Sequence, residues 1–139
     1  MVLLTLSAWA AEKTAPRLLY PGFPPLEKTE AFKQYQLRPK GDLSKLVYLI
    51  DRFAQSDIEI IYEGLHVPSR PAAAVAKWFL SRNYKKQTPG EWIYQWCNRT
   101  IPNGRLVLVK LPDGSTLPGR DVLFNELAAL EAAEKKTPA

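Results

Sequence analysis

Residues 42–64 read DLSKLVYLIDRFAQSDIEIIYEG, and the spacing of their apolar side chains changes partway along. Over residues 43–55 the apolar positions recur every three or four residues, which predicts an amphipathic helix with Asp42 as its N-cap. Over residues 58–63 the apolar positions alternate with polar ones, which predicts a strand that ends at Gly64. A helix followed at once by a strand places the chain in a mixed fold class.

The rest of the chain predicts three more helices and one more strand. Ser69 and Pro71 begin a second helix, and residues 88–91 (TPGE) form a capping box with proline at the first helical position, so a third helix begins there. Residues 105–111 (RLVLVKL) are rich in leucine and β-branched valine, as in a strand, and Asp121 caps a last helix. We therefore expect an α+β fold, in which a small two-stranded antiparallel sheet packs with about four helices.

Composition divides the chain into four segments. Residues 1–11 (MVLLTLSAWAA) are apolar and uncharged and end in a small-x-small pattern, which is typical of a secretory signal peptide. We expect residues 12–40 to form a proline-rich extended arm, 41–134 the α+β domain and 135–139 a frayed tail. The protein is then expected to be exported to the periplasm, although a buried N-terminal strand is an alternative for the first segment. No stretch approaches the roughly 20 apolar residues that a transmembrane helix needs.

The proline-rich arm carries large apolar side chains between residues that disfavour helix. Only residues 27–37 have a composition that suits one or two helical turns. An extended segment of this kind is suited to lying in a groove, either of its own domain or of a partner protein, and the sequence leaves both alternatives open. The candidate contacts for a partner are Leu18, Leu19, Tyr20, Phe23 and Leu26.

The net charge of +5 is concentrated in the middle of the chain, because residues 64–120 carry nine Lys and Arg and only two Asp and Glu. Basic and aromatic side chains together are typical of surfaces that bind polyanions. In an exported protein we expect an anionic polymer, lipid head groups or an acidic protein surface, and no nucleic acid. The alternative is that these bases only complement the helix dipole. The candidate surface consists of Lys77, Trp78, Arg82, Tyr84, Lys85 and Lys86.

The titratable residues give little support for catalysis. A single Cys and a single His exclude an internal disulfide and a structural zinc site. We expect Cys97 to be a buried core thiol and His66 a surface residue. Glu59 and Glu63 point the same way on the predicted strand, but roughly 13 Å separates them, which is too far for a glycosidase pair. We expect no enzymatic activity, no metal and no cofactor.

Several local patterns also match a known family. They are the extended segment that ends at Gly64, the alanine-rich helix at 72–76 (AAAVA), Trp92-Ile93, Gly104, and the strand ending at 109–112 (VKLP). Through these patterns residues 43–127 resemble the YfeK-like family of small bacterial periplasmic proteins of unknown function. The resemblance implies export and an α+β fold of this size, and it implies no activity.

Together these observations predict an exported, non-enzymatic binding protein, an accessory or structural component of a periplasmic or cell-envelope assembly. The arm would dock on a protein partner, and the basic helix end would offer a second contact. One alternative is a periplasmic inhibitor or immunity protein that blocks an exported enzyme. A second is a small cell-wall hydrolase, which would need Glu59, Glu63 or His66 in a concave pocket.

Overall fold

A computed structural model describes Tyr20 and residues 23–136. The predicted signal peptide at 1–11 and the candidate contacts Leu18 and Leu19 lie outside the described residues. The elements follow in the order η1 (Leu26–Lys28), α2 (Glu30–Leu37), α3 (Asp42–Ala54), β1 (Glu59–Tyr62), β2 (Leu65–Pro68), α4 (Ser69–Asn83), α5 (Pro89–Trp96), β3 (Leu108–Lys110), β4 (Thr116–Pro118) and α6 (Gly119–Lys136).

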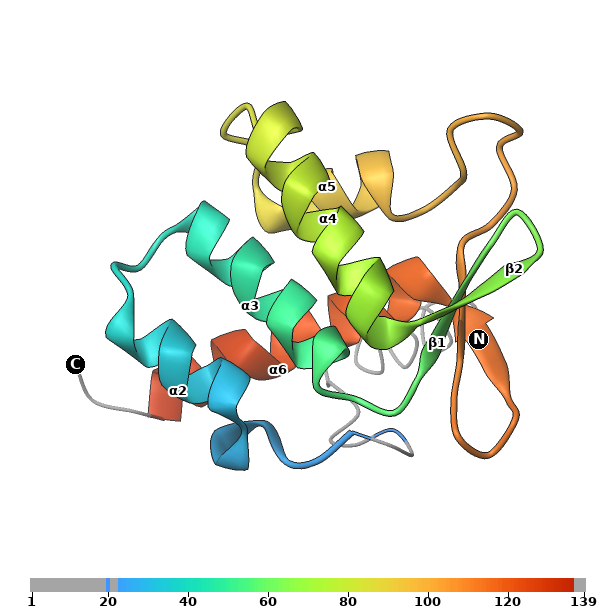
Figure 1. The fold of residues 1–139 in the computed structure, drawn as a ribbon. Coiled ribbons are helices and arrows are strands. Elements are labelled where there is room, and N and C mark those ends of the chain that lie inside the picture. Colours follow the sequence, from blue (N-terminus) through green and yellow to red (C-terminus); the bar gives the residue numbers. More distant parts are fainter. Residues whose placement is uncertain (1–19, 21–22, 137–139) are drawn as a thin grey trace, which may run out of the picture.

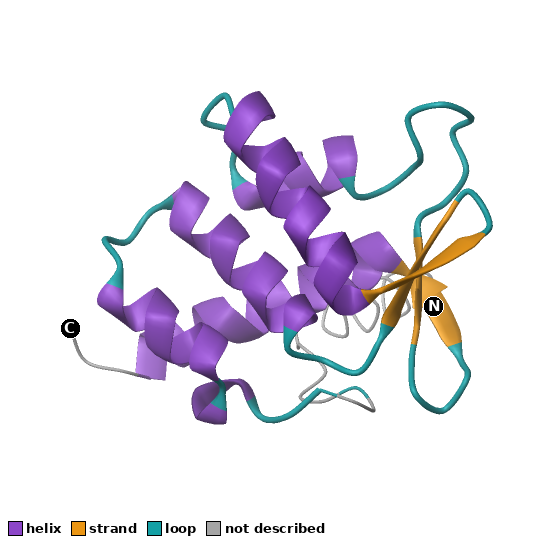
Figure 2. Cartoon of the chain, in the orientation of Figure 1, coloured by secondary structure: helices purple, strands orange, loops and turns teal. Residues whose placement is uncertain are grey.

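The described chain is an α+β fold, as the sequence predicts. The strands gather at one end of the molecule and the helices form the rest (Figure 2). Helices α3 and α4 pack side by side, and α2 packs against α3 away from the strands (Figure 1). Helix α6 runs behind them and reaches both the helices and the sheet.

The sheet has four antiparallel strands in the order β2-β1-β3-β4, and not the two that we predicted. The predicted pairing is correct, because β1 pairs with β3 and Ile60 lies opposite Val109. The strands that the sequence did not predict are the two edge strands, β2 and β4, which are short and end in proline. Strand β2 follows β1 through a two-residue turn at Glu63 and Gly64, whose φ angles are 52° and 78°. Such a turn favours Asn-Gly or Asp-Gly, so Glu-Gly is a weak hairpin signal.

The described residues contain five α-helices where we predicted about four. Helix α2 is the addition, and it is stable for a local reason: the Thr29 hydroxyl accepts a hydrogen bond from the Phe32 backbone N–H. The capping box before α5 is confirmed, since the Thr88 and Glu91 side chains accept each other's backbone N–H bonds at 3.2 and 2.9 Å. Asp42 is not an N-cap; it is the first residue of α3.

The last helix also begins earlier than predicted. Helix α6 starts at Gly119, so Asp121 lies in its first turn and does not cap it. An acidic side chain in the first turn still interacts favourably with the partial positive charge of the helix N-terminus. The sequence thus predicted correctly that Asp42 and Asp121 lie at helix N-termini. It was wrong in making each an N-cap, because both lie in the first turn of their helix.

The described part of the proline-rich arm packs on its own domain. Phe23 is 4% exposed, its ring centre lies 5.6 Å from that of Phe53, and Tyr20 packs on its other edge at 6.1 Å. Leu26 is also buried, in the same apolar cluster as Phe32. This burial corresponds to the alternative in which the groove belongs to the same domain. Phe23 and Leu26 are therefore not accessible to a partner in this fold.

A buried ion pair joins the first long helix to the last. The Arg52 guanidinium Nε of α3 lies 2.6 Å from a carboxylate oxygen of Glu126 on α6, and both side chains are 1% exposed. The Arg52 guanidinium also stacks on the Phe23 ring at 5.3 Å. Burial raises the pKa of Glu126, and the Arg52 charge opposes that shift. The pair lies where the two apolar clusters of the core meet.

The packing of Phe23 makes a prediction about stability. Phe23→Ala should lower the free energy of unfolding by about 3 kcal/mol, because it removes a buried ring and the cover of Arg52. Urea denaturation at pH 7 measures the change. Leu37→Ala, at an exposed position of α2, is the matched control and should change stability by less than about 0.5 kcal/mol. Equal stability of the two variants would show that the arm does not pack on the domain.

The ion pair makes a second prediction. Arg52→Met should lower the free energy of unfolding by about 3 to 5 kcal/mol, because it leaves the Glu126 carboxylate buried without its cation. The double variant Arg52→Met with Glu126→Leu should recover much of that loss, because no buried charge remains. A double-mutant cycle from urea denaturation measures the coupling. If the losses of the two single variants simply add in the double variant, the coupling between Arg52 and Glu126 is refuted.

Candidate functional site

The described residues enclose an apolar cleft of about 390 Å³. It lies between α4, the β1–β2 hairpin and the segment 97–107 that follows α5, and residues of α3 and α6 also line it. Its volume is within the usual range of ligand-binding pockets. The main wall residues are Ala72, Val75, Ala76 and Phe79 of α4, Ile60, Tyr62 and Val67 of the hairpin, and Trp92, Trp96, Cys97 and Ile101 of α5 and the following segment.

The sequence of α4 explains why a cleft forms beside it. Ala73 and Leu80 are buried, on the side of α4 that packs on α3. The neighbouring stripe contains Ala72 and Ala76, whose side chains are too short to reach the opposite wall. Val75, on the same stripe, is 65% exposed. The apolar residues of this stripe therefore recur at helical spacing, and they line an open cleft.

The opposite wall is a loop held in place by the hairpin turn. The Tyr62 hydroxyl accepts a hydrogen bond from the Ile101 backbone N–H at 3.2 Å. The Glu63 carboxylate accepts hydrogen bonds from the Thr100 hydroxyl and the Asn103 amide. These bonds, that from Thr100 most of all, lower the pKa of Glu63. The turn thus positions Ile101, which is 65% exposed, at the mouth of the cleft.

Aromatic rings form the floor of the cleft next to α5. The Phe79 ring centre lies 4.9 Å from that of Trp96 and 5.9 Å from that of Trp92, with edge-to-face geometry. Tyr84, which we predicted to belong to the basic surface, is half-buried, and its ring lies 6.4 Å from Trp92. Tyr84 thus packs against the ring of Trp92 and does not line the cleft. The Trp96 Nε1–H is buried and has no hydrogen-bond partner among the residues that the structure describes.

Cys97 lies in the cleft wall and is half-buried. Its apolar surroundings raise the pKa of the thiol to about 12. A nucleophilic cysteine requires the opposite shift, because the thiolate is the reactive form. Cys97 therefore behaves as an apolar wall residue.

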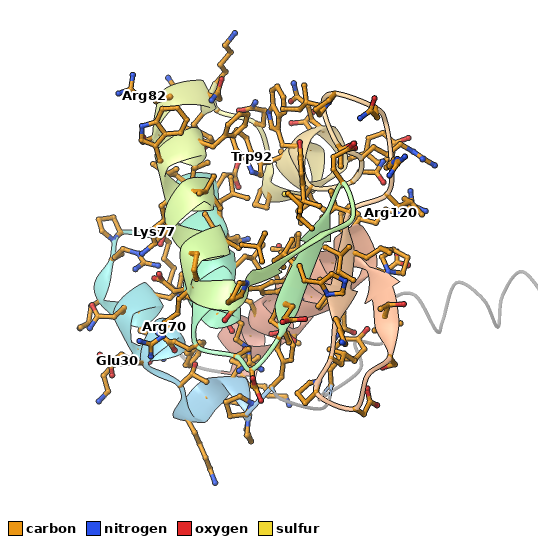
Figure 3. All side chains as sticks on the ribbon, turned by 45° about the vertical axis from the view of Figure 1, so that its right-hand side comes forward. Glu30, Arg70, Lys77, Arg82, Trp92 and Arg120 are labelled. Atoms are coloured by element: carbon orange, nitrogen blue, oxygen red, sulfur yellow. The ribbon has the colours of Figure 1, made fainter. Side chains whose placement is uncertain are left out.

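The predicted basic surface divides into separate parts. The Lys77 ammonium lies 2.6 Å from the Asp51 carboxylate of α3, and Lys77 does not line the cleft. The Arg82 guanidinium stacks on the exposed Trp78 ring at 5.0 Å. Since Trp78 and Arg82 follow Val75 by three and seven residues, they lie beside and beyond Val75 on the surface of α4, outside the lining of the cleft. Figure 3 shows Lys77 and Arg82 at different heights along α4, with Trp92 deeper in the fold. Lys85 and Lys86 are exposed beyond the end of the helix.

The carboxylates that we weighed for catalysis do not line the cleft. Glu59 and Glu63 were expected to point the same way on one strand, but Glu63 lies in the turn after β1. Nδ1 of His66 lies 3.2 Å from Oε1 of Glu59, and both side chains are about half exposed. Alternation along β1 and β2 puts this pair on the opposite face of the hairpin from Ile60 and Tyr62. Among the described residues, no group of three or more His, Cys, Asp and Glu could hold a metal ion.

No family model, no curated protein and no solved structure matches the chain. None of the helices that the structure describes is both long enough and apolar enough to cross a membrane.

The contacts of Glu63 predict a pH-dependent loop. Because the folded pKa is lowered, the carboxylate stabilises the loop fully above the ordinary glutamate pKa of 4.5, and that contribution is lost as the pH falls below it. The backbone amides of residues 100, 101, 103 and 104 should therefore exchange faster in acid than at pH 7, when each rate is taken relative to the amides of α6 at the same pH. Glu63→Gln should exchange faster at pH 7, because a neutral acceptor forms weaker hydrogen bonds. Asp57→Asn, at an exposed carboxylate, is the control, and identical exchange in both variants would contradict the role of Glu63.

Proposed function

We propose that the chain is an exported, non-enzymatic binding protein that acts as an accessory component of a periplasmic or cell-envelope assembly, and that it binds its partner through the apolar cleft. The observation that carries the proposal is the cleft itself. Its walls are apolar, and two large side chains at its mouth, Val75 and Ile101, are 65% exposed. Apolar surface of this kind, grouped in one concavity, is typical of a site that another molecule covers.

The absence of catalytic groups from the cleft supports binding over catalysis. Of the residues weighed for acid–base or nucleophilic chemistry, only Cys97 lines the cleft, and its thiol has a raised pKa. Glu59 and His66 lie on the other face of the hairpin, and Glu63 holds the loop. These positions give no support to the hydrolase alternative, which needs one of them in a concave pocket.

In this proposal the partner docks at the cleft and not at the proline-rich arm. Phe23 and Leu26 are buried in their own domain, so a partner would have to displace them. The exposed part of the basic surface, in contrast, continues from the cleft, because Trp78 and Arg82 lie on the same side of α4 as Val75. One partner can therefore contact the cleft and part of that surface together.

Export is the second half of the proposal and has a separate basis. It rests on the apolar residues 1–11 and on the resemblance to the YfeK-like family. Fractionation of cells that express the full chain tests it: recovery from the periplasm, with a mature N-terminus near residue 11, would support export. Recovery from the cytoplasm with residues 1–11 still attached would overturn it.

A substitution that fills the cleft tests the binding site. Ala76→Trp places a large side chain in the cleft and should reduce the binding of the apolar dye ANS at least about tenfold. Ala74→Trp makes the same change at an exposed position of the same helix and should leave binding within about twofold. Urea denaturation of both variants checks that each is folded. Equal dye binding by the two folded variants would show that the cleft is not the site.

A further inference from the structure

We propose that the cleft receives the apolar face of an amphipathic helix whose polar face is acidic, supplied by a protein partner. This inference rests on the proposed function, since it concerns the same cleft. It adds the conformation and the charge of the segment that binds there. Three features of the described residues carry it: the polar groups of the walls, the length of the α4 stripe and the charges around the mouth.

The side chains of the walls offer few hydrogen bonds to an extended peptide. The Ser69 hydroxyl donates to the Ser56 carbonyl at 2.9 Å, and the Tyr62 hydroxyl accepts from Ile101. The remaining side-chain donors are the Tyr62 O–H and the buried Trp96 Nε1–H. An extended segment in this cleft would bury backbone N–H and C=O groups without partners, at a large cost in free energy. A helix pairs its own backbone groups and avoids that cost.

The length of the cleft matches two turns of a docked helix. Its apolar wall on α4 extends from Ala72 to Phe79, seven residue steps or about 10.5 Å along the helix axis, and Ser69 adds a polar residue one turn before it. The apolar anchors of an amphipathic helix at positions i, i+3, i+4 and i+7 span the same length. The small side chains of Ala72 and Ala76 leave room for large anchors opposite them.

The apolar surface extends beyond the cleft, which favours a protein over a lipid chain. Leu65 is exposed and pairs directly with Tyr62 across the hairpin, so it lies on the cleft side of the sheet. Trp78 is exposed on the α4 side of the mouth. An acyl chain in the cleft would leave both side chains in water. A helix, about 10 Å wide with its side chains, would cover the cleft and its flanks together.

The charges around the mouth select an acidic polar face. Arg82 lies on α4, stacked on Trp78, and Arg99 and Arg105 belong to the loop that carries Ile101. Arg99 donates a hydrogen bond to the Gly104 carbonyl, and the Arg105 charge acts on Glu63. Glu63, the acidic side chain at the base of that loop, already accepts two hydrogen bonds. A partner that places Asp or Glu opposite these guanidinium groups gains favourable electrostatic interactions, and a basic partner is repelled.

Two designed helical peptides test the inference in fluorescence-polarisation titrations of the full chain. Both have Leu and Phe at i, i+3, i+4 and i+7; one has Glu and the other Lys at the remaining positions. The Glu peptide should bind at least about tenfold more tightly at low salt, and the difference should shrink at about 0.5 M salt. Arg82→Glu with Arg105→Glu should weaken the Glu peptide about tenfold or more. Lys28→Glu with Lys33→Glu changes the net charge equally on exposed positions of η1 and α2, and should have less than a twofold effect.

The outcomes separate this inference from the proposed function. Equal binding of the two peptides, lost in Ala76→Trp but kept in Ala74→Trp, would overturn the acidic selection and leave the cleft as a binding site. Binding of the Glu peptide that survives Ala76→Trp would place it outside the cleft and overturn the inference. Binding of laurate but of neither peptide would also overturn it, in favour of a lipid ligand. Failure of the peptides, laurate and ANS alike would overturn the proposed function too.

Discussion

The buried ion pair between Arg52 and Glu126 is the constraint around which the interior of this protein is arranged, because neither charge can be buried without the other. It fixes α3 against α6 in the interior, where two charges are tolerated only if they face each other. On both helices it falls between the residues of the two apolar clusters, so it sets how those clusters meet. The Phe23 ring stacks on the guanidinium, which brings the proline-rich segment into the same core. A segment that composition separates from the domain is thereby held as part of it.

With α3 held against α6, the position of α4 decides where the cleft forms. Helix α4 packs on α3 through Ala73 and Leu80 and through the partly exposed ion pair between Lys77 and Asp51. Its adjacent apolar stripe lines the cleft together with α5 and the hairpin, and the small alanine side chains leave the cleft open. Burying apolar side chains favours closure of such a gap, so an open one requires rigid walls. The stacked rings on one side and the Glu63 loop on the other supply them.

The binding surface therefore combines features that arise separately. The apolar walls come from α4, α5 and the hairpin, and the charges at the mouth come from the end of α4 and from the loop after α5. Neither would select a partner alone: apolar contact supplies affinity with little discrimination, and exposed charge supplies discrimination with little affinity. Their juxtaposition suits a segment that is apolar on one face and acidic on the other.

The sequence by itself determined the elements whose signals are local. The capping box at 88–91 and the helix at 43–55 follow from short-range spacing and turn chemistry. The pairing of the strands at 58–63 and 105–111 followed because these were the two strands that the sequence predicted. The excess of basic residues was equally visible. The edge strands β2 and β4 were not, because three or four residues ending in proline acquire strand structure only by pairing with a neighbour.

Only the tertiary structure decided the environment of each apolar and charged side chain. Helical spacing identifies Val75 and Phe79 as one stripe, but whether a stripe is covered depends on the distance to the next element. The same limit applies to the proline-rich arm, where Phe23 could equally have been exposed, and to Lys77 and Arg82, which differ only in the side of α4 they occupy. Burial and charge pairing are properties of residues distant in the chain, so no local pattern can specify them.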